Sequence, residues 1–177
     1  GLVVPPGRRR RSDWRAPAGQ AGVPVCDDGP NRLWCADYKG WFRTGDGSRC
    51  DPLTVTDSFS RYLLRCRIVD RLSYRAARGQ FEAAFREYGL PAAIRTDNGS
   101  PFATVGPLGL SRLSAWWMRL GIAHERIAPG RPEQNGRHER MHGTLKCEAA
   151  RPPCWSLRAQ QARFDAFARE YNHDRPH

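Results

Sequence analysis

The stretch RLWCADYKGWFR, residues 32–43, is the first part of the chain with the composition of a β-strand. Aromatic and aliphatic side chains dominate it, and the carboxylate of Asp37 lies in its middle. The segment TGDGS, residues 44–48, follows it and is typical of a hairpin turn, because Asp-Gly tolerates positive φ angles. Two further strands are predicted at 49–57 and 61–69. The sequence therefore predicts an antiparallel meander of three strands.

The remainder of the chain alternates between helical and strand patterns. Residues 73–89 place apolar side chains at helical spacing and end on Gly89, a residue suited to a C-cap. Further elements are predicted in the order strand, helix, strand, helix, helix, at residues 91–97, 109–121, 122–127, 137–146 and 157–172. This order indicates an α/β fold with a mixed five-stranded sheet, three antiparallel strands and then two parallel ones, flanked by helices.

The overall composition points to a globular protein with an acidic partner. The chain has 177 residues, of which 40% are hydrophobic, enough for one ordinary domain and a tail. Residues 1–31 are rich in Pro, Gly and Arg and are expected to form a basic linker, so that the domain occupies residues 32–177. The net charge of +11 and the pI of about 10.1 favour nucleic acid as the partner.

Several classes of protein are disfavoured by the same inspection. No run of apolar residues is long enough for a membrane span, and the N-terminal segment lacks the order of a signal peptide. The six cysteines show no C-x-x-C pairing. We therefore expect reduced thiols in a cytoplasmic protein with no membrane partner.

Two aspartates occupy positions at which metal-dependent phosphoryl transfer places its ligands. Such chemistry uses two divalent ions about 3.5–4 Å apart, held by carboxylates on rigid elements. Asp37 lies within the first predicted strand, and Asp97 ends the fourth, in IRTDNGSPF, where Asn98-Gly99 turns the chain. Each aspartate taken alone could equally be an edge charge or a turn residue.

Five segments together carry a resemblance to a known family: ADYKG (36–40), PLTVTDSFSRYLL (52–64), RTDNGSPF (95–102), APGRPEQNGRHERMHGTLK (128–146) and YNHDRPH (171–177). In this order they resemble the catalytic core of bacterial insertion-sequence transposases of the retroviral-integrase superfamily. The resemblance implies a ribonuclease-H-like fold and a D-D-E triad that binds two Mg²⁺ or Mn²⁺ ions. It also implies cleavage of transposon ends, their joining to target DNA, and a homo-oligomer active at the bacterial nucleoid. By motif, Asp37 and Asp97 are the two aspartates.

The resemblance further implies that a helix-turn-helix DNA-binding region precedes the linker and that the core continues beyond residue 177. Two other functions stay open on the sequence alone. One is a catalytically inactive DNA-binding remnant of a transposase, and the other is a generic ribonuclease-H-like nuclease.

The third carboxylate could be either of two glutamates. The best-known family pattern has 35 residues between the second aspartate and the glutamate, and this count from Asp97 leads to Glu133. Glu133 lies in a Pro/Gly/Asn-rich loop, whereas Glu139 lies in the following predicted helix and matches the family motif letter by letter. Loop insertions before the glutamate cost little. We therefore assign the role to Glu139, with Lys146 seven residues later on the same helix face.

The letters HERMH, residues 138–142, also satisfy the zinc-protease pattern H-E-x-x-H. The extended form of that pattern fails because Leu145 stands where a third histidine is required, and only the distant Glu170 could replace it. We expect His138 and His142 to be incidental to catalysis, as DNA contacts or as part of a polar helix face.

The remaining polar candidates are assigned to DNA or to turns. The expected DNA contacts are Lys39, Arg131, Asn135, Arg137, Arg140 and Lys146. Asp46, Asp51 and Asp57 are expected to be turn residues, and Trp116 and Trp117 to pack in the core.

Overall fold

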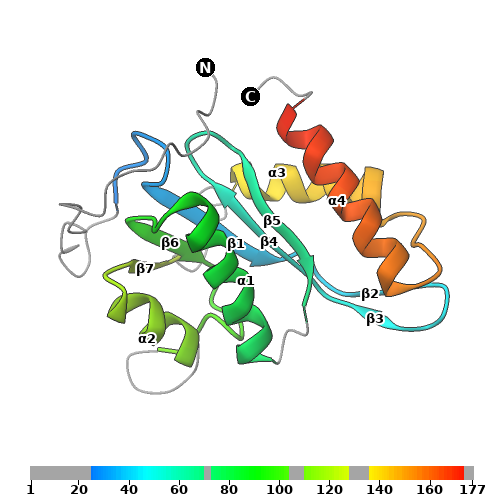
Figure 1. Cartoon of the computed structure of the whole chain (residues 1–177), viewed down its shortest axis with the longest axis horizontal. Coiled ribbons are helices and arrows are strands. Elements are labelled where there is room, and N and C mark those ends of the chain that lie inside the picture. Colours follow the sequence, from blue (N-terminus) through cyan, green and yellow to red (C-terminus); the bar gives the residue numbers. More distant parts are fainter. Residues whose placement is uncertain (1–24, 70–72, 104–109, 128–135, 174–177) are drawn as a thin grey trace.

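The computed structural model describes residues 25–69, 73–103, 110–127 and 136–173. Its centre is a five-stranded sheet in the order β5-β4-β1-β6-β7 (Figure 1). β1 (Leu33–Tyr38) pairs antiparallel with β4 (Pro52–Asp57), which pairs antiparallel with β5 (Leu63–Ile68). On its other side β1 pairs parallel with β6 (Ala93–Thr96), followed by β7 (Ala123–Arg126). The predicted mixed sheet is confirmed.

The prediction of one continuous strand over residues 32–43 is wrong. β1 ends at Tyr38, and the chain passes through Gly40 with φ +88° before β2 (Phe42–Arg43) begins. β2 pairs with β3 (Arg49–Cys50) in a separate two-stranded sheet. The conformation at Gly40 is one that L-residues with a Cβ rarely adopt, so the strand bends away from the main sheet there.

The predicted hairpin turn at residues 44–48 joins β2 to β3. Gly47 has φ +82°, and the Asp46 carboxylate accepts hydrogen bonds from the Thr44 hydroxyl and the Ser48 amide. Asp57 also has its predicted turn role, because its carboxylate accepts from the amide and hydroxyl of Ser60. Asp51 instead pairs with the Arg49 guanidinium at 2.6 Å between β3 and β4.

Two helices cover one face of the sheet. α1 (Tyr74–Tyr88) begins at Ser73, whose hydroxyl accepts from the Ala76 amide, and ends at Gly89 with φ +86°. α2 (Arg112–Arg119) begins at a capping box formed by Ser111 and Ser114. The core between these helices and the sheet contains Trp34, Ala36, Leu53, Val55, Phe81, Ile94, Leu113 and Trp117. The predicted core roles are confirmed, since Trp117 is fully buried and Trp116 packs against this core.

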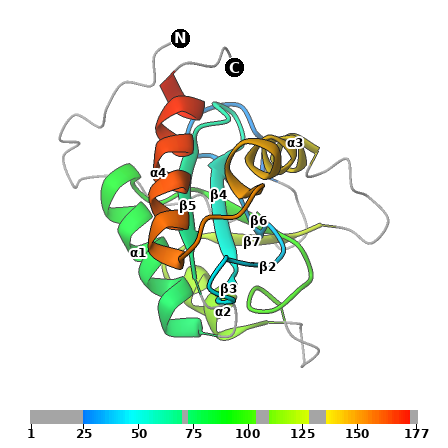
Figure 2. The same cartoon turned by 90° about the vertical axis from the view of Figure 1, so that its right-hand side faces the viewer.

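The other face is covered by α3 (Gly136–Leu145) and α4 (Leu157–His173) (Figure 2). α3 continues as a π-helix, η3 (Lys146–Ala150), which the sequence did not predict. A second core lies beneath them and contains Cys50, Leu63, Cys66, Met141, Leu145, Ala149, Phe164 and Phe167. The two faces of the sheet therefore carry separate cores.

All six cysteines are free thiols. Within the described ranges, no helix combines the length and apolar character needed to cross a membrane. Most of the predicted linker at residues 1–31 lies outside the described part of the chain.

Candidate active site

The two predicted aspartates lie at matching positions on neighbouring parallel strands. β1 and β6 pair with Ala36 opposite Thr96, so Asp37 and Asp97 each stand one residue beyond that pair. Adjacent strands are about 4.8 Å apart, which brings the two backbones as close as a sheet allows. β1 is the central strand of the sheet, so Asp37 is held on a rigid element. Asp97 begins a turn in which its Oδ1 accepts from the Gly99 amide at 3.1 Å.

Strand alternation directs both aspartates toward the face that α3 covers. Trp34 and Ala36 belong to the core beneath α1 and α2, so the intervening positions and Asp37 face the opposite side. Thr54, which pairs with Asp37 across β1 and β4, contacts α3. Thr96 points toward the first core, where its hydroxyl oxygen lies 2.9 Å from His124 Nε2. The next residue, Asp97, is therefore expected to point to the opposite face, which α3 covers.

Two buried histidines fasten α3 to this face of the sheet. His138 and His142 are 1% and 8% exposed, and their Nε2 atoms lie 2.9 and 2.6 Å from the Thr54 hydroxyl oxygen. His138 Nδ1 lies 2.8 Å from the Thr56 hydroxyl oxygen. The expectation that these histidines contact DNA or lie on a polar helix face is wrong, because both rings are packed against β4.

The hydrogen-bond pattern fixes the protonation of this cluster. Because the Thr54 hydroxyl donates to the Asp37 carbonyl oxygen at 3.1 Å, its oxygen accepts from the two Nε2–H groups. The Thr56 hydroxyl then donates to His138 Nδ1. Burial lowers the pKa of His138 to about 3. Burial and then the neighbouring His138 lower the pKa of His142 to about 2. Both imidazoles are therefore neutral at pH 7.

The cluster reaches Asp37 and brings Glu139 into its neighbourhood. His142 Nδ1 lies 3.8 Å from Asp37 Oδ2, with the aspartate side chain 22% exposed. Glu139 is exposed in the first turn of α3, three residues before His142 and therefore its neighbour on the helix surface. The contacts of His142 thus place the turn of α3 that carries Glu139 above the strand that carries Asp37.

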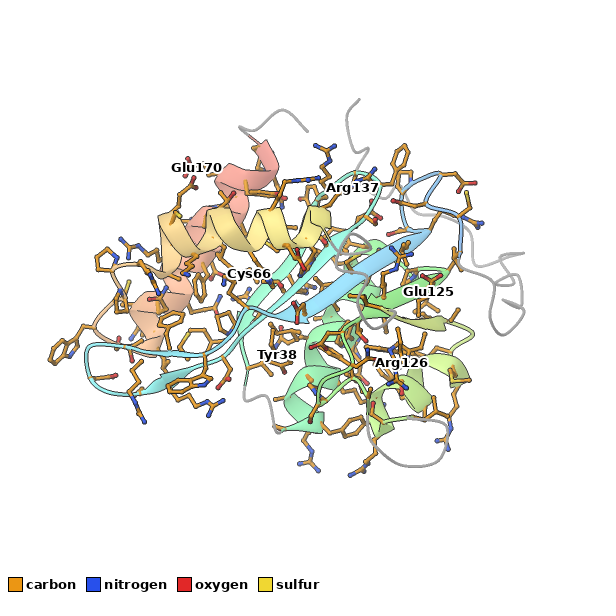
Figure 3. The ribbon with its side chains drawn as sticks, turned by 180° about the vertical axis from the view of Figure 1, so that it is seen from behind. Tyr38, Cys66, Glu125, Arg126, Arg137 and Glu170 are labelled. Carbon is orange, nitrogen blue, oxygen red and sulfur yellow. The ribbon has the colours of Figure 1, made fainter. Side chains whose placement is uncertain are left out.

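The residues predicted to contact DNA differ in their surroundings. Lys39 follows Asp37 by two residues in the chain. Burial and then the Lys146 charge lower the pKa of Lys39, whereas Asp37 acts in the opposite direction. Arg137 lies in the first turn of α3 (Figure 3). Its guanidinium forms an ion pair with the Asp27 carboxylate at 3.0 Å and donates a hydrogen bond to the Ser58 carbonyl at 2.9 Å. Arg140 is exposed on α3. Arg131, Glu133 and Asn135 lie outside the described residues.

A three-ligand metal group is not preformed in the described ranges. No three His, Cys, Asp or Glu side chains of the described residues come close enough together to hold one ion. The structure brings Asp37 and Asp97 to adjacent strand positions but does not bring Glu139 into one group with both. Glu170, the distant candidate for a zinc site, lies on α4 (Figure 3).

Sequence reasoning missed Thr54 and Thr56 as the partners of α3. The available signal was the spacing of the two threonines in PLTVTD, which places both on one face of the predicted strand. The structure buries every position of this segment. A second signal was the spacing of His138, Met141, His142 and Leu145, which form the buried stripe of α3. Together they indicate a helix that docks polar groups onto a polar strand face.

Comparison with known proteins gives the family. A model of the integrase core domain matches residues 27–132, and a second integrase core domain model matches residues 120–177. An uncharacterized 39.2 kDa protein of insertion element IS476 from Xanthomonas euvesicatoria is 32% identical over 96% of this chain and 47% of its own length. An uncharacterized 31.7 kDa protein of insertion element IS407 from Burkholderia multivorans is 27% identical over 96% of the chain and 58% of its own length. The chain thus spans about half the length of these curated relatives.

Solved structures share the fold. The catalytic core domain of BIV integrase superposes with a TM-score of 0.61 at 17% identity, covering 83% of this chain and 87% of that one. The HTLV-2 integrase catalytic core domain in complex with magnesium gives a TM-score of 0.59 at 19% identity, covering 81% and 88%. These likenesses confirm the ribonuclease-H-like fold, and the family match covers more than half of the chain. The chain belongs to the integrase core domain family and resembles the insertion-element proteins of bacteria.

Proposed function

We propose that this chain is the catalytic core of a metal-dependent DNA transposase, a polynucleotidyl transferase with Asp37, Asp97 and Glu139 as its carboxylates. The observation that carries the proposal is the matching position of Asp37 and Asp97 on two central parallel strands. The helix that bears Glu139 is docked across the same face through His138 and His142. The family match and the insertion-element relatives support the same function.

The donor set suits Mg²⁺ or Mn²⁺. Carboxylate oxygens are the ligands that these hard cations prefer, and the HTLV-2 integrase core, which shares this fold, is a complex with magnesium. We infer that Asp37, Asp97 and Glu139 hold two such ions. When bound, the ions would supply a polarised nucleophile and charge stabilisation on phosphate oxygens. Glu139 would complete the set of ligands from the first turn of α3.

Residues of the chain beside the carboxylates are suited to hold the DNA phosphate. Lys39 lies two residues after Asp37 and feels the charge of Lys146, so we infer that these two cationic side chains border the predicted metal site. Arg140 extends from the exposed surface of α3, one residue after Glu139. Arg137 contributes differently, since its side chain connects the start of α3 to the segments that carry Asp27 and Ser58. We assign phosphate contact to Lys39, Arg140 and Lys146, and a positioning role to Arg137.

The proposed reaction consists of two phosphoryl transfers. In the first, water attacks the phosphorus at the transposon end, the new P–O bond forms, and the 3′ oxygen leaves with a proton. In the second, the freed 3′-hydroxyl attacks a phosphorus in the target strand, and the target's 3′ oxygen leaves. Neither step requires a covalent bond to the protein. The DNA partners are therefore transposon ends and target DNA, and we expect self-association in the active complex.

Asparagine variants of the two aspartates test this proposal. Asp37→Asn and Asp97→Asn keep the size of the side chain and remove its charge, and each is expected to lower strand transfer by at least about a thousandfold, as for loss of a metal ligand. Asp46→Asn is the matched control, since Asp46 lies in the hairpin turn between β2 and β3. Strand transfer is measured with Mg²⁺ and Mn²⁺ on insertion-element ends. Retention of activity by either active-site variant contradicts the proposal.

A further inference from the structure

A cavity lined by arginines opens between α1 and α2. Its volume is about 740 Å³, and its lining residues are Tyr74, Arg75, Arg78, Gly79, Glu82 and Arg112. The α1 contribution follows helical spacing at positions 75, 78, 79 and 82, whereas the buried stripe of the same helix is Ala77, Phe81 and Ala84. The cavity is therefore formed by the outer face of α1 and the beginning of α2.

Aromatic rings hold two of the guanidinium groups in place. The Arg112 guanidinium lies 4.7 Å from the centre of the Tyr74 ring, and that of Arg78 lies 4.9 Å from the centre of the Trp116 ring. Trp116 packs against the core, so the platform beneath Arg78 is fixed. Because the cation–π contacts already restrict these two side chains, the arginines lose less conformational entropy when they bind an anion.

The balance of charge in the cavity is positive. Among the described lining residues, Arg75, Arg78 and Arg112 face one carboxylate, that of Glu82, which accepts from the Arg78 Nε at 2.8 Å. The cavity also adjoins the first turns of α1 and α2, neither of which contains an acidic residue. The N-terminal end of a helix favours negative charge, so the backbone adds to the field of the guanidinium groups. A planar guanidinium binds phosphate oxygens in bidentate fashion.

The cavity and the carboxylates lie on opposite faces of the sheet. α1 and α2 cover the face in front of the reader in Figure 1, and α3 crosses the face seen in Figure 3. Asp37 faces α3, and the sheet with its first core separates it from α1. The nucleotides that reach the carboxylates are therefore different from any that reach this cavity.

We propose that the cavity between α1 and α2 is a second DNA-binding site, which takes the phosphodiester backbone of a segment distinct from the one at the carboxylates. This inference rests on the proposed function in that DNA is the substrate, but recognition at this cavity uses Arg75, Arg78 and Arg112 and none of the three carboxylates. Three guanidinium groups in an open cavity, two of them held over aromatic rings, suit consecutive phosphates along one strand. Binding there is independent of base sequence.

Gly79 allows the charge of the cavity to be changed without disturbing the fold. A Cβ at position 79 would have no atom within 4 Å, and glycine is unfavourable inside a helix. Gly79→Glu and Gly79→Gln therefore both fold, and they differ only in charge. A glutamate at this position would compete with phosphate for Arg75, four residues before it, and for its neighbours in the cavity.

The test is duplex binding by the whole chain, measured by fluorescence anisotropy with a labelled 30-base-pair duplex at several salt concentrations. We expect Gly79→Glu to bind about five- to tenfold more weakly than Gly79→Gln, and Gly79→Gln to match the wild type. The variant Arg75→Gln/Arg112→Gln is expected to lower the slope of log K against log salt by about 0.9 for each phosphate that the protein no longer neutralises.

Equal affinities of the Gly79→Glu and Gly79→Gln variants would overturn the proposal, as would an unchanged salt slope in the double arginine variant. Sedimentation velocity tests the other occupant, an acidic surface of a second copy of the chain. If Gly79→Glu shifts the self-association of the protein and leaves duplex binding unchanged, the cavity serves the second copy and the proposal fails. Inactivity of the chain in strand transfer would leave these binding measurements unaffected, so the two proposals can fail separately.

Discussion

Replacement of Thr54 by valine tests the polar contact that docks α3 onto the sheet. Valine keeps the shape of threonine but removes the hydroxyl oxygen that His138 and His142 both contact, at 2.9 and 2.6 Å. The two rings are 1% and 8% exposed, so water cannot take the place of the hydroxyl without a rearrangement of α3. Thr54→Val therefore leaves two N–H donors buried and unsatisfied.

The size of the effect follows from the cost of such groups. A buried donor without its partner costs about 1–3 kcal/mol. With about 1–2 kcal/mol for each of the two donors, the free energy of unfolding should fall by about 2–4 kcal/mol in Thr54→Val. Thr54→Ser is the control, because it keeps the hydroxyl and removes one methyl group, worth about 0.8 kcal/mol. Equilibrium unfolding in urea measures both, and the midpoint of the valine variant should fall by roughly 1–2 M. If the valine and serine variants agree within about 0.5 kcal/mol, the hydroxyl does not hold α3 and the reasoning is refuted.

Three further predictions concern stability. Burial lowers the pKa of His124 to about 4, so the unfolded chain binds a proton that the folded chain does not, and stability falls as the pH drops from about 6.5 toward 4. Between pH 7 and 5.5 the wild type should lose about 1 kcal/mol more than His124→Phe, measured by urea unfolding at each pH, and parallel pH profiles would contradict this assignment. Gly45→Ala should cost about 1–2 kcal/mol in thermal or urea unfolding, because its Cβ would lie 2.7 Å from the Trp155 ring and 3.1 Å from the Trp155 Cα. Gly143→Ala should stabilise the protein by about 0.5–1 kcal/mol, because a Cβ there has no atom within 4 Å in α3, and destabilisation would show that α3 is packed differently.

Local sequence signals predicted most of the elements and the sheet. Strand alternation, turn glycines and helical spacing are properties of short segments, and they located α1, β6, α2, β7 and α4 within a few residues. Asp37 and Asp97 were predicted as a pair from the family motifs, and the structure places each one residue beyond the paired Ala36 and Thr96.

Features that depend on distant contacts were not predictable in the same way. His138 appeared polar and exposed because its partners, Thr54 and Thr56, lie more than 80 residues earlier in the chain. The break after Tyr38 depends on the φ angle that Gly40 adopts when the chain leaves the main sheet. The π-helix after Leu145 likewise reflects packing of Ala149 and Ala150 into the second core. Each is a tertiary effect that overrides a local pattern.

The assignment of the third carboxylate is the central claim, and strand transfer by two glutamine variants tests it most directly. Glu139→Gln and Glu133→Gln are compared with the wild type on the same DNA ends, with Mg²⁺ and with Mn²⁺. We predict that Glu139→Gln lowers strand transfer by at least about a thousandfold, while Glu133→Gln stays within about threefold of the wild type. Full activity in Glu139→Gln with inactivity in Glu133→Gln would contradict the assignment, and would move the third ligand from α3 to the segment before it.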